Sequence, residues 1–299
     1  MDSSKVIRKA IIDLGTNTFN LLIAEWFEGK WRRIHSEKDG VALGMGGINH
    51  KILTEDAILR AENTLRHFKT ISESFGTSEI RAIGTSAIRD AKNQSEFVDR
   101  IKRDIGIEIM VISGNEEADY IYRGVAQTID FSIPSLIMDI GGGSTEFILV
   151  DKNGIQEKIS LNIGVSRMLQ LFSCDDPIKP NQVIELNQWL EEQAAGFFNN
   201  LEVSRLIGAS GSFETFYELI HNTTIPSLDA AIELPFPNFY SELDRLIYST
   251  QAERDLNPWI VPIRKRMAPF AAVKTKWIID TLRITETYIS PYSLKEGAL

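Results

Sequence analysis

One short pattern occurs twice in this chain and limits the folds that it can adopt. An apolar strand runs into an Asp, a turn of glycine and hydroxyl residues follows, and a second apolar strand leaves the turn. The fuller copy covers residues 137–148 (Ile-Met-Asp-Ile-Gly-Gly-Gly-Ser-Thr-Glu-Phe-Ile), and the other covers residues 12–23. A unit that recurs in both halves of a 299-residue chain predicts two similar lobes.

Each turn predicts a β-hairpin that binds phosphate. Glycine can take a positive φ and has no Cβ, so the amides of Gly15 and of Gly141–Gly143 can approach an anion closely. Asp13 and Asp139 end the strands before the turns, where a carboxylate can hold the metal ion that accompanies a phosphate. Two such turns facing across a cleft can hold a polyphosphate from both sides. The alternative is a pair of ordinary Gly-rich hairpin turns. We favour binding sites, because a buried Asp without a partner is costly.

The candidate ligands follow from this pattern. Asp139 and Glu146 flank the second turn and form an acidic pair beside it. The candidate phosphate contacts are Asp13, Gly15, Thr16, Asn17, Thr18, Gly141, Gly142, Gly143, Ser144 and Thr145. A third small-residue turn at 208–212 follows a predicted strand and adds Gly208, Ser210 and Gly211. A turn of this third kind is weak evidence by itself.

Composition and charge exclude several classes of function. The length fits two domains, and 43% hydrophobic with 24% charged residues is typical of a soluble globular protein. No apolar run approaches the roughly 20 residues of a membrane helix, and Met1–Lys5 lacks the apolar core of a signal peptide. The net charge of −9 argues against non-specific nucleic-acid binding. Cys174 is the only cysteine, so no internal disulfide can form and a reducing cytoplasm fits.

The basic residues and the histidines indicate no site by their spacing. Basic residues cluster at 32–33 and at 264–266, with Lys274 and Lys276 further on, and we interpret each cluster as a solvated face. The four histidines, His35, His50, His67 and His221, do not have the spacing of metal ligands.

Strands alternate with helices along the chain, which predicts a mixed-sheet α/β protein. Strands are expected at 9–13, 19–25, 79–83, 105–112 and 206–207. Helices are expected at 54–75, from 87 onward, at 113–122, 182–199, 213–220, 240–250 and 270–283. Thr54 fits the N-cap of the first helix. Residues 130–134 are expected to form the seam between an N-terminal lobe, 1–126, and a second lobe, 127–299.

Glu117 is the candidate general base. Ser113 and Glu116 fit a capping box, in which Glu116 folds back from the third helical position. That structural role leaves Glu117 free to point into the cleft. The helix dipole is expected to keep this carboxylate ionised, and an ionised carboxylate can orient and deprotonate a water molecule. A solvated surface Glu is the alternative, and it is favoured on local evidence alone.

Arg89 is a candidate phosphate contact. It lies in a predicted helix that follows a strand, and Asn93, four residues on, is expected to share its face. The guanidinium presents a planar set of donors that matches phosphate oxygens, and helix-start amides would add to an anion site. An Arg paired with a surface carboxylate is the alternative.

Together these motifs resemble the exopolyphosphatase/guanosine pentaphosphate phosphohydrolase (Ppx/GppA) family, within the actin–Hsp70–sugar-kinase superfold. The resemblance covers nearly the whole chain, with motifs at 12–19, 84–93, 112–118, 139–146, 161–164, 208–212 and 293–297. It implies two actin-like, ribonuclease H-like lobes with mixed sheets and a cleft between them. The final helix is expected to pack back on the first lobe.

The resemblance also implies an activity and roles for particular residues. It implies hydrolysis of a terminal phosphoanhydride with release of orthophosphate, with Mg²⁺ in the cleft. Glu117 takes the catalytic position, Asp139 and Glu146 lie near the metal and the water, and Asp13 and Arg89 match phosphate positions. We expect a cytoplasmic protein, and a homodimer is an open alternative because the sequence does not give the oligomeric state. Longer relatives continue into a helical C-terminal domain where this chain ends, so we expect a preference for short chains or nucleotides over processive digestion of long chains.

The substrate and even the class of function stay open. Inorganic polyphosphate is the first hypothesis, and guanosine pentaphosphate (pppGpp) 5′-phosphohydrolysis is the second, because the cleaved bond is the same. A different class is a non-catalytic nucleotide-binding switch of the actin–Hsp70 type. A sugar kinase fits less well, and fold analogy alone does not exclude it.

Overall fold

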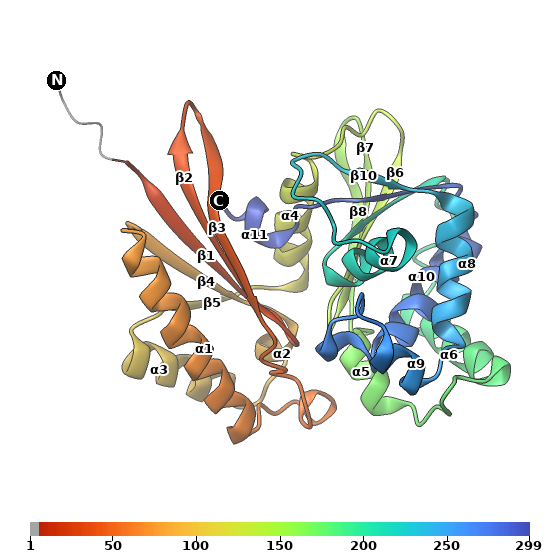
Figure 1. The fold of residues 1–299 in the computed structure, drawn as a ribbon, viewed down its shortest axis with the longest axis horizontal. Coiled ribbons are helices and arrows are strands. Elements are labelled where there is room, and N and C mark those ends of the chain that lie inside the picture. Colours follow the sequence, from red (N-terminus) through yellow and green to blue (C-terminus); the bar gives the residue numbers. More distant parts are fainter. Residues whose placement is uncertain (1–5) are drawn as a thin grey trace.

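A computed structural model describes residues 6–299, which form two lobes, each built on one β-sheet (Figure 1). The expectation about a signal peptide falls on Met1–Lys5, outside the described residues. No helix among residues 6–299 is both long and apolar enough to cross a membrane.

The first lobe holds a five-stranded sheet in the order β3-β2-β1-β4-β5. Its strands are β1 (Arg8–Leu14), β2 (Phe19–Phe27), β3 (Lys30–Asp39), β4 (Glu79–Gly84) and β5 (Ile109–Val111). Its helices are η1 (Ile48–His50), α1 (Glu55–Ser74), α2 (Ser86–Arg89) and α3 (Gln94–Ile105), and α4 (Gly114–Val125) follows them. Strands β1, β2 and β3 are antiparallel neighbours, whereas β4 and β5 continue the sheet parallel to β1.

The second lobe holds a six-stranded sheet in the order β10-β11-β9-β6-β7-β8. Its strands are β6 (Ser135–Ile140), β7 (Thr145–Asp151), β8 (Gly154–Leu161), β9 (Arg205–Ala209), β10 (Ile232–Leu234) and β11 (Glu286–Ile289). Its longer helices are α5 (Val165–Leu171), α6 (Pro180–Ala194), α7 (Gly211–His221), α8 (Phe236–Ile247) and α10 (Ala268–Leu282). Its short ones are α9 (Gln251–Leu256), η2 (Pro262–Arg264) and α11 (Leu294–Gly297).

The two sheets repeat one topology. In the second lobe β6 takes the place of β1, with β7 and β8 antiparallel on one side and β9 and β11 parallel on the other. Only β10, antiparallel to β11 at the edge, has no counterpart within the described first sheet. The repeated pattern in the sequence therefore marks a repeated mixed sheet, which confirms the expected α/β architecture of two actin-like lobes.

Strand alternation places the two turn aspartates on the inner faces of the sheets. Alternate residues of β1 and β6 pack in the outer cores, namely Ala10, Ile12, Leu14, Leu136, Met138 and Ile140. Ile11 and Ile137 lie between them in sequence and pack in the core between the sheets. Asp13 and Asp139 continue this inner series, since successive side chains point to opposite faces of a strand. Both carboxylates therefore point to the space between the lobes.

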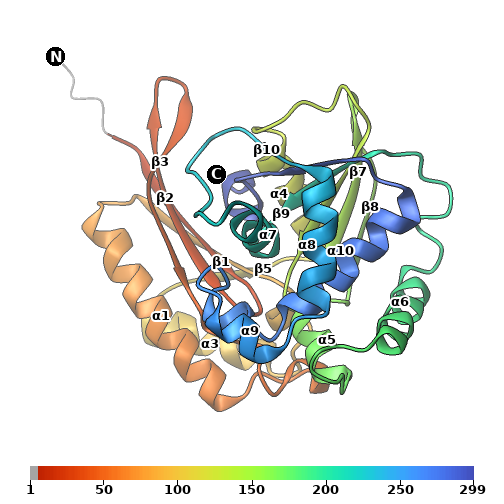
Figure 2. The same ribbon diagram turned by 45° about the vertical axis from the view of Figure 1, so that its right-hand side comes forward.

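Two helices, α4 and α11, occupy the inner core. Figure 1 shows α4 and α11 between the two sheets, and both contribute residues to the core that Ile11 and Ile137 share. α11 packs on α4, β1 and β2, and α4 also packs on β7 and β8. The outer faces are covered by α1 and α3 in the first lobe and by α6, α8 and α10 in the second (Figure 2). Because α4 packs on the second sheet, a boundary between residues 126 and 127 stays a proposal.

Several predicted elements differ from the observed ones. The helix expected to start at 54 is α1, and Thr54 caps it by accepting the amide of Ala57 at 3.4 Å. The strand expected over 105–112 is only β5, because Ile105 still belongs to α3, which ends at Gly106 with φ 77°. The helix expected over 182–199 starts earlier and stops at Ala194. The elements that were not predicted are β3, β8, β10, β11, α3, α5 and α9. In β3, half-exposed polar residues hide the alternation of the strand.

Candidate active site

The two predicted turns meet in one cleft between the lobes. They line a cavity of about 170 Å³ together with residues of α7, η2 and the segment before α11. A Cβ added to Gly142 would lie 2.6 Å from Asn17 Nδ2, and one added to Gly143 would lie 2.7 Å from Thr16 Oγ1. The second turn therefore packs directly on the first. The predicted facing arrangement is what the chain adopts.

Carbonyl groups of both turns accept hydrogen bonds from other segments, whereas the amides of the turns have no such backbone partners in the part of the chain that the structure describes. In the first turn, Thr16 O accepts Gly44 N at 2.9 Å and Asn17 O accepts Ala42 N at 2.8 Å. In the second, Gly141 O accepts Val165 N at 3.1 Å and Gly142 O accepts Ser166 N at 2.9 Å. Within residues 6–299, no backbone carbonyl outside the strand ladders accepts from the amides of 15–18 or 141–144. These amides are the donors that an anion in the cleft would find.

The loop glycines are needed for close approach, not for positive φ. Glycine can take a positive φ, but Gly15 and Gly141–Gly143 do not use this freedom, because the positive-φ glycines lie elsewhere in the described chain. A Cβ at Gly143 would lie 2.5 Å from Ser86 Oγ. What glycine supplies in the second turn is the missing side chain.

The strand register pairs each turn aspartate with a polar residue across the hairpin. Asp139 lies opposite Glu146 on β6 and β7, and Asp13 lies opposite Asn20 on β1 and β2. Asn20 Nδ2 donates to Asp13 Oδ2 at 3.0 Å. Equivalent positions therefore carry a second carboxylate in one lobe and an amide in the other. The hairpin of the second lobe thus has two carboxylates at the positions where that of the first lobe has one.

Burial raises the pKa values of these carboxylates. The pKa of Asp13 rises to about 7 through burial, against the hydrogen bond from Asn20. Burial and then the charge of Asp139 raise the pKa of Glu146 to about 7, and burial raises that of Asp139 as well. Ser293 Oγ donates to Asp139 Oδ2 at 2.5 Å, and Ser160 Oγ donates to Glu146 Oε1 at 2.7 Å. A cluster of crowded carboxylates favours a cation among them.

Glu117 joins this cluster from α4. The predicted capping box is present, since Glu116 N donates to Ser113 Oγ at 3.2 Å and Ser113 N to Glu116 Oε2 at 2.8 Å. Glu117 is 7% exposed and lines the cleft, so a solvated surface role is excluded. Burial and the charge of Glu146 raise the pKa of Glu117 well above its ordinary value. The helix dipole was expected to keep this carboxylate ionised, and burial outweighs it.

Arg89 holds Glu117 and does not line the cleft. Its Nη1 donates to Glu117 Oε2 at 2.7 Å and to Ile112 O at 3.2 Å. Asn93 does not share its face, because α2 ends at Arg89 and Asn93 instead bonds both backbone groups of Leu53, at 2.9 and 3.0 Å. A helix that is one turn long cannot align residues four apart beyond its end.

The third turn approaches the cleft through its middle residues. Ser210 has a φ of 73°, and its Oγ donates to Ile140 O at 3.1 Å, which joins this turn to the end of β6. Gly211 faces the Arg264 guanidinium, and Gly208 lies under the ring of Phe213. A Cβ at either glycine would clash, so both are close-packing positions.

The structure brings most of the predicted site residues together. Those that line the cleft are Asp13, Gly15, Thr16, Asn17, Thr18, Glu117, Asp139, Gly141, Gly142, Gly143, Ser144, Ser210 and Gly211. Arg89, Thr145, Glu146 and Gly208 lie behind this surface and are absent from the lining. The Asn17 side chain is engaged between the lobes, since its Oδ1 accepts Ser166 Oγ at 2.5 Å.

Sequence reasoning missed the cations of the cleft. Lys38, Arg264 and Lys295 all line it, as does Glu214. The interpretation of the basic cluster at 264–266 as a solvated face is wrong for Arg264. It is also wrong for Lys274, which is fully buried and donates from Nζ to Thr145 Oγ1 at 2.7 Å and to Ile163 O. Only the motif at 293–297 carried a signal, because it contains Lys295.

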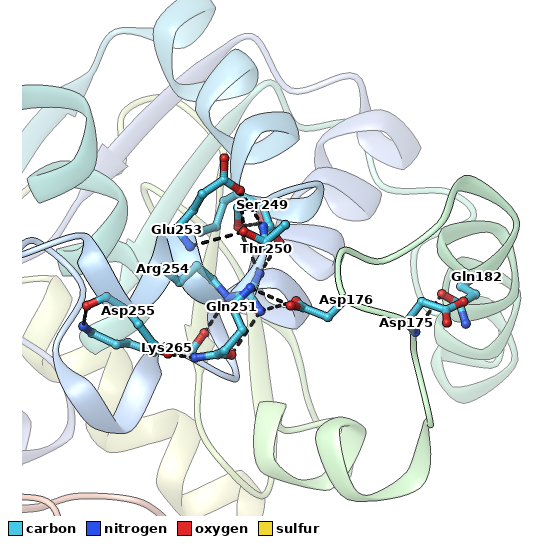
Figure 3. A network of polar contacts seen from close by, with 11 residues as sticks. Asp175, Asp176, Gln182, Ser249, Thr250, Gln251, Glu253, Arg254, Asp255 and Lys265 are labelled. Carbon is cyan, nitrogen blue, oxygen red and sulfur yellow. Dashed lines mark hydrogen bonds and ion pairs between the residues drawn. The ribbon is translucent and has the colours of Figure 1, made fainter.

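A buried arginine fixes the segment that carries Arg264. Arg254 donates to Lys265 O at 2.8 Å, to Gln251 Oε1 at 3.1 Å and to Asp176 Oδ1 at 2.8 Å (Figure 3). Figure 3 shows that these groups come from α9, from the segment after η2 and from the loop before α6. Because Lys265 follows Arg264 directly, this network holds the backbone next to the cleft.

Metal ligation by protein side chains alone is sparse. Among residues 6–299, no three His, Cys, Asp or Glu side chains are grouped as ligands for one ion. An ion at Asp139 and Glu146 would need water or substrate oxygens to complete its shell. That is the usual arrangement for Mg²⁺, which binds one or two carboxylates together with substrate phosphates. The excess of buried carboxylates fits such a cation.

The chain matches the Ppx/GppA phosphatase family over residues 22–299. Among solved structures, an exopolyphosphatase from Cytophaga hutchinsonii is 34% identical with a TM-score of 0.93 and covers 97% of this chain and 96% of its own. The Aquifex aeolicus PPX-GPPA enzyme is 25% identical with a TM-score of 0.82, over 98% of this chain and 99% of its own.

Two relatives known by sequence are longer proteins. A bifunctional 3-dehydroquinate synthase/phosphatase of Fusobacterium nucleatum is 34% identical over 221 residues, which is 69% of this chain and 33% of that protein. A guanosine-5′-triphosphate,3′-diphosphate pyrophosphatase of Vibrio parahaemolyticus is 31% identical over 214 residues, 71% of this chain and 43% of its own length. The match spans less than half the length of either relative. This chain belongs to the Ppx/GppA phosphatase family.

Proposed function

We propose that this member of the Ppx/GppA family hydrolyses the terminal phosphoanhydride bond of inorganic polyphosphate and releases orthophosphate. The observation that carries the proposal is the meeting of two amide-lined turns beside Asp13, Glu117 and Asp139 in one cleft. Main-chain donors suit phosphate oxygens, and carboxylates suit a metal ion and a water molecule. The likeness to the Cytophaga exopolyphosphatase over nearly its full length supports the same reading.

Glu117 is the group that we assign to activate the attacking water. Burial and the nearby carboxylate raise its pKa, and a carboxylate whose pKa lies closer to the working pH is a stronger base. Arg89, 2.7 Å from Glu117, orients the carboxylate and favours its ionised form. In a loose phosphoryl-transfer transition state, such positioning accounts for much of the catalysis.

Asp139 and Glu146 are the residues that we assign to a divalent cation, and we propose Mg²⁺. Asp139 lines the cleft, and Glu146 lies opposite it on the neighbouring strand. Bound Mg²⁺ would neutralise charge on the phosphoryl oxygens. Asp13 faces the same space from the other lobe, and its hydrogen bond from Asn20 fixes the direction of its carboxylate.

Both turns would cradle the phosphates. We assign the amides of residues 15–18 and 141–144 as donors to phosphate oxygens, since no backbone carbonyl outside the strand ladders accepts from them in the described chain. Ser210 and Gly211 close a third side of the cleft. Donors that are fixed before the substrate arrives stabilise developing charge without reorganisation.

Hydrolysis of pppGpp at its 5′ end is the second candidate. The Vibrio relative named as a guanosine-5′-triphosphate,3′-diphosphate pyrophosphatase supports it. The same residues would act, because the bond is again a terminal phosphoanhydride. A non-catalytic nucleotide-binding switch is the candidate from another class, and the buried, cleft-lining Glu117 weighs against it.

A substrate panel separates these candidates. Phosphate release is measured with Mg²⁺ and equal concentrations of tripolyphosphate, long-chain polyphosphate, pppGpp, ATP and ADP. Fastest release from a polyphosphate supports the first candidate, and the profile over chain length tests the expected preference for short chains. Fastest release from pppGpp replaces the first candidate with the second. Binding of ATP without any phosphate release would support the switch.

The cytoplasmic location and the homodimer are also proposals. The single cysteine, Cys174, which is half-buried and free, is consistent with a reducing compartment. Cell fractionation tests the location, and light scattering on the purified protein tests the dimer.

A further inference from the structure

The carboxylate of Glu214 is held by cations from both lobes. Lys38 Nζ donates to Glu214 Oε1 at 2.5 Å and to Oε2 at 2.7 Å. Arg264 Nη2 lies 3.3 Å from Oε2. Lys38 comes from β3 in the first lobe, whereas Glu214 and Arg264 come from α7 and η2 in the second. All three line the candidate active site.

This cluster adjoins the catalytic carboxylates. Lys295 also lines the cleft and interacts electrostatically with both Glu214 and Asp13. Its Nζ lies 3.0 Å from Glu296 Oε1, so Lys295 has its own partner on α11. A substrate that extends from the acidic cluster past Lys295 would therefore meet Lys38 and Arg264. There it would also meet Glu214.

Glu214 carries a negative charge in this arrangement. Burial opposes ionisation, but the charges of Lys38 and Arg264 lower the pKa of Glu214 to about 2. Arg264 has a second acceptor within the lobe, since its Nη1 donates to Thr215 Oγ1 at 3.1 Å. Two cations that face a cleft suited to polyphosphate are thus already paired with an anion of the protein.

We propose that Glu214 is a specificity-determining residue that competes with the substrate for Lys38 and Arg264. A polyphosphate that reaches past Lys295 must displace the Glu214 carboxylate to pair its outer phosphates with these cations. A substrate too short to reach them leaves Glu214 in place. The inference rests on the proposed function, because it takes the ligand of this cleft to be a polyphosphate anion.

The opposite role is that Glu214 holds Lys38 and Arg264 in the geometry that the substrate needs. The two roles predict opposite effects when the charge is removed and the shape is kept. Glu214→Gln does this, since the amide retains an acceptor oxygen. Glu233→Gln, on the exposed part of β10, changes the net charge equally and is the matched control.

Binding measured without turnover tests the proposal. Calorimetry in EDTA compares tripolyphosphate and pyrophosphate on wild type, Glu214→Gln and Glu233→Gln. We expect Glu214→Gln to bind tripolyphosphate about tenfold more tightly, about 1.4 kcal/mol, with a smaller gain for pyrophosphate. Glu233→Gln should stay within about twofold of wild type, because a remote surface charge is screened. The proposal is overturned if Glu214→Gln binds tripolyphosphate no more tightly than wild type does. It is also overturned if neither wild type nor Glu214→Gln binds tripolyphosphate.

A second substitution checks that the gain arises at the ion pair. Lys38→Met removes the cation for which Glu214 and substrate compete, so Glu214→Gln should gain at most about threefold in that background. A full tenfold gain there overturns the assignment to Lys38. Circular dichroism establishes that each variant is folded. Phosphate release is a separate measurement, so a protein that hydrolyses nothing but shows these affinities refutes the enzyme and not the competition.

Discussion

The close contact between the two turns gives a prediction whose size follows from the structure. In Gly143→Ala, the new Cβ would lie 2.5 Å from Ser86 Oγ, 2.7 Å from Thr16 Oγ1 and 2.9 Å from Ser86 Cβ. Ordinary contacts of a Cβ begin near 3.4 Å. Rotation of the Ser86 hydroxyl removes the first contact but leaves the other two. The second turn must therefore move away from the first by a large fraction of an ångström.

That displacement should affect catalysis more than folding. A misplacement of about 1 Å can cost about 100-fold in rate, so we expect kcat/KM for tripolyphosphate to fall about 100-fold, or about 2.7 kcal/mol. Overpacking should cost roughly 1–3 kcal/mol of stability. Steady-state phosphate release and thermal unfolding measure the two effects separately.

Gly29→Ala is the matched control. Gly29 has a φ of 80° with nothing within 4 Å of an added Cβ, and it lies in the β2–β3 turn, outside the cleft. The left-handed backbone makes alanine costly there, roughly 1–2 kcal/mol. Gly29→Ala should therefore lose about as much stability as Gly143→Ala, while its kcat/KM should stay within about twofold of wild type. If folded Gly143→Ala kept kcat/KM within about threefold of wild type, close approach of the turns would not be required for catalysis.

Three further predictions concern charge. Arg89→Met removes a cation that lowers the pKa of Glu117, so the acidic limb of the kcat/KM profile should move to higher pH; a limb that moves to lower pH contradicts the pairing. Mg²⁺ should raise the melting temperature of wild type by mass action, with about 2.7 kcal/mol gained at 100 times the Kd, and Asp139→Asn should lose most of this shift; an equal shift in both proteins argues against Asp139 as a ligand. Burial lowers the pKa of Lys274 to about 7 from 10.5, so between these values the unfolded chain binds more protons and folding gains stability as pH rises. In chemical denaturation with EDTA, the free energy of unfolding of wild type minus that of Lys274→Met should therefore increase by roughly 2 kcal/mol from pH 7 to pH 9. A difference that does not change with pH would contradict the burial of Lys274.

The repeated hairpins and their aspartates could be predicted from the sequence because they depend on local rules. Alternation along a strand determines the face on which Asp13 and Asp139 lie, and a capping box needs only Ser113 and the residue three positions on. These features use neighbours in the chain, so one sequence is enough to find them.

Electrostatics of the site could not be predicted in the same way, because they depend on contacts between distant segments. The ionisation of Glu117 was misjudged, since its burial depends on α4 lying between two sheets. Lys38 and Glu214 are 176 positions apart and meet only when the lobes do. Arg264 resembled a surface charge until η2 placed it against α7.

The prediction for the helix that contains Arg89 failed for a different reason. A strand followed by a helical pattern suggested that Arg89 and Asn93 share a face, but the helix ends at Arg89. The side chain of Asn93 instead forms hydrogen bonds with the backbone of Leu53, which lies 40 positions away. Tertiary hydrogen bonding overrides local helical preference there.

Glu117→Gln provides the most direct test of the central claim, that this carboxylate activates water in a cleft that binds polyphosphate. The amide cannot accept the proton of the water, so single-turnover phosphate release should fall by about 100-fold to 10,000-fold. Tripolyphosphate affinity, measured on the same preparation, should stay within about threefold of wild type. Phosphate release at the wild-type rate from Glu117→Gln would contradict the account.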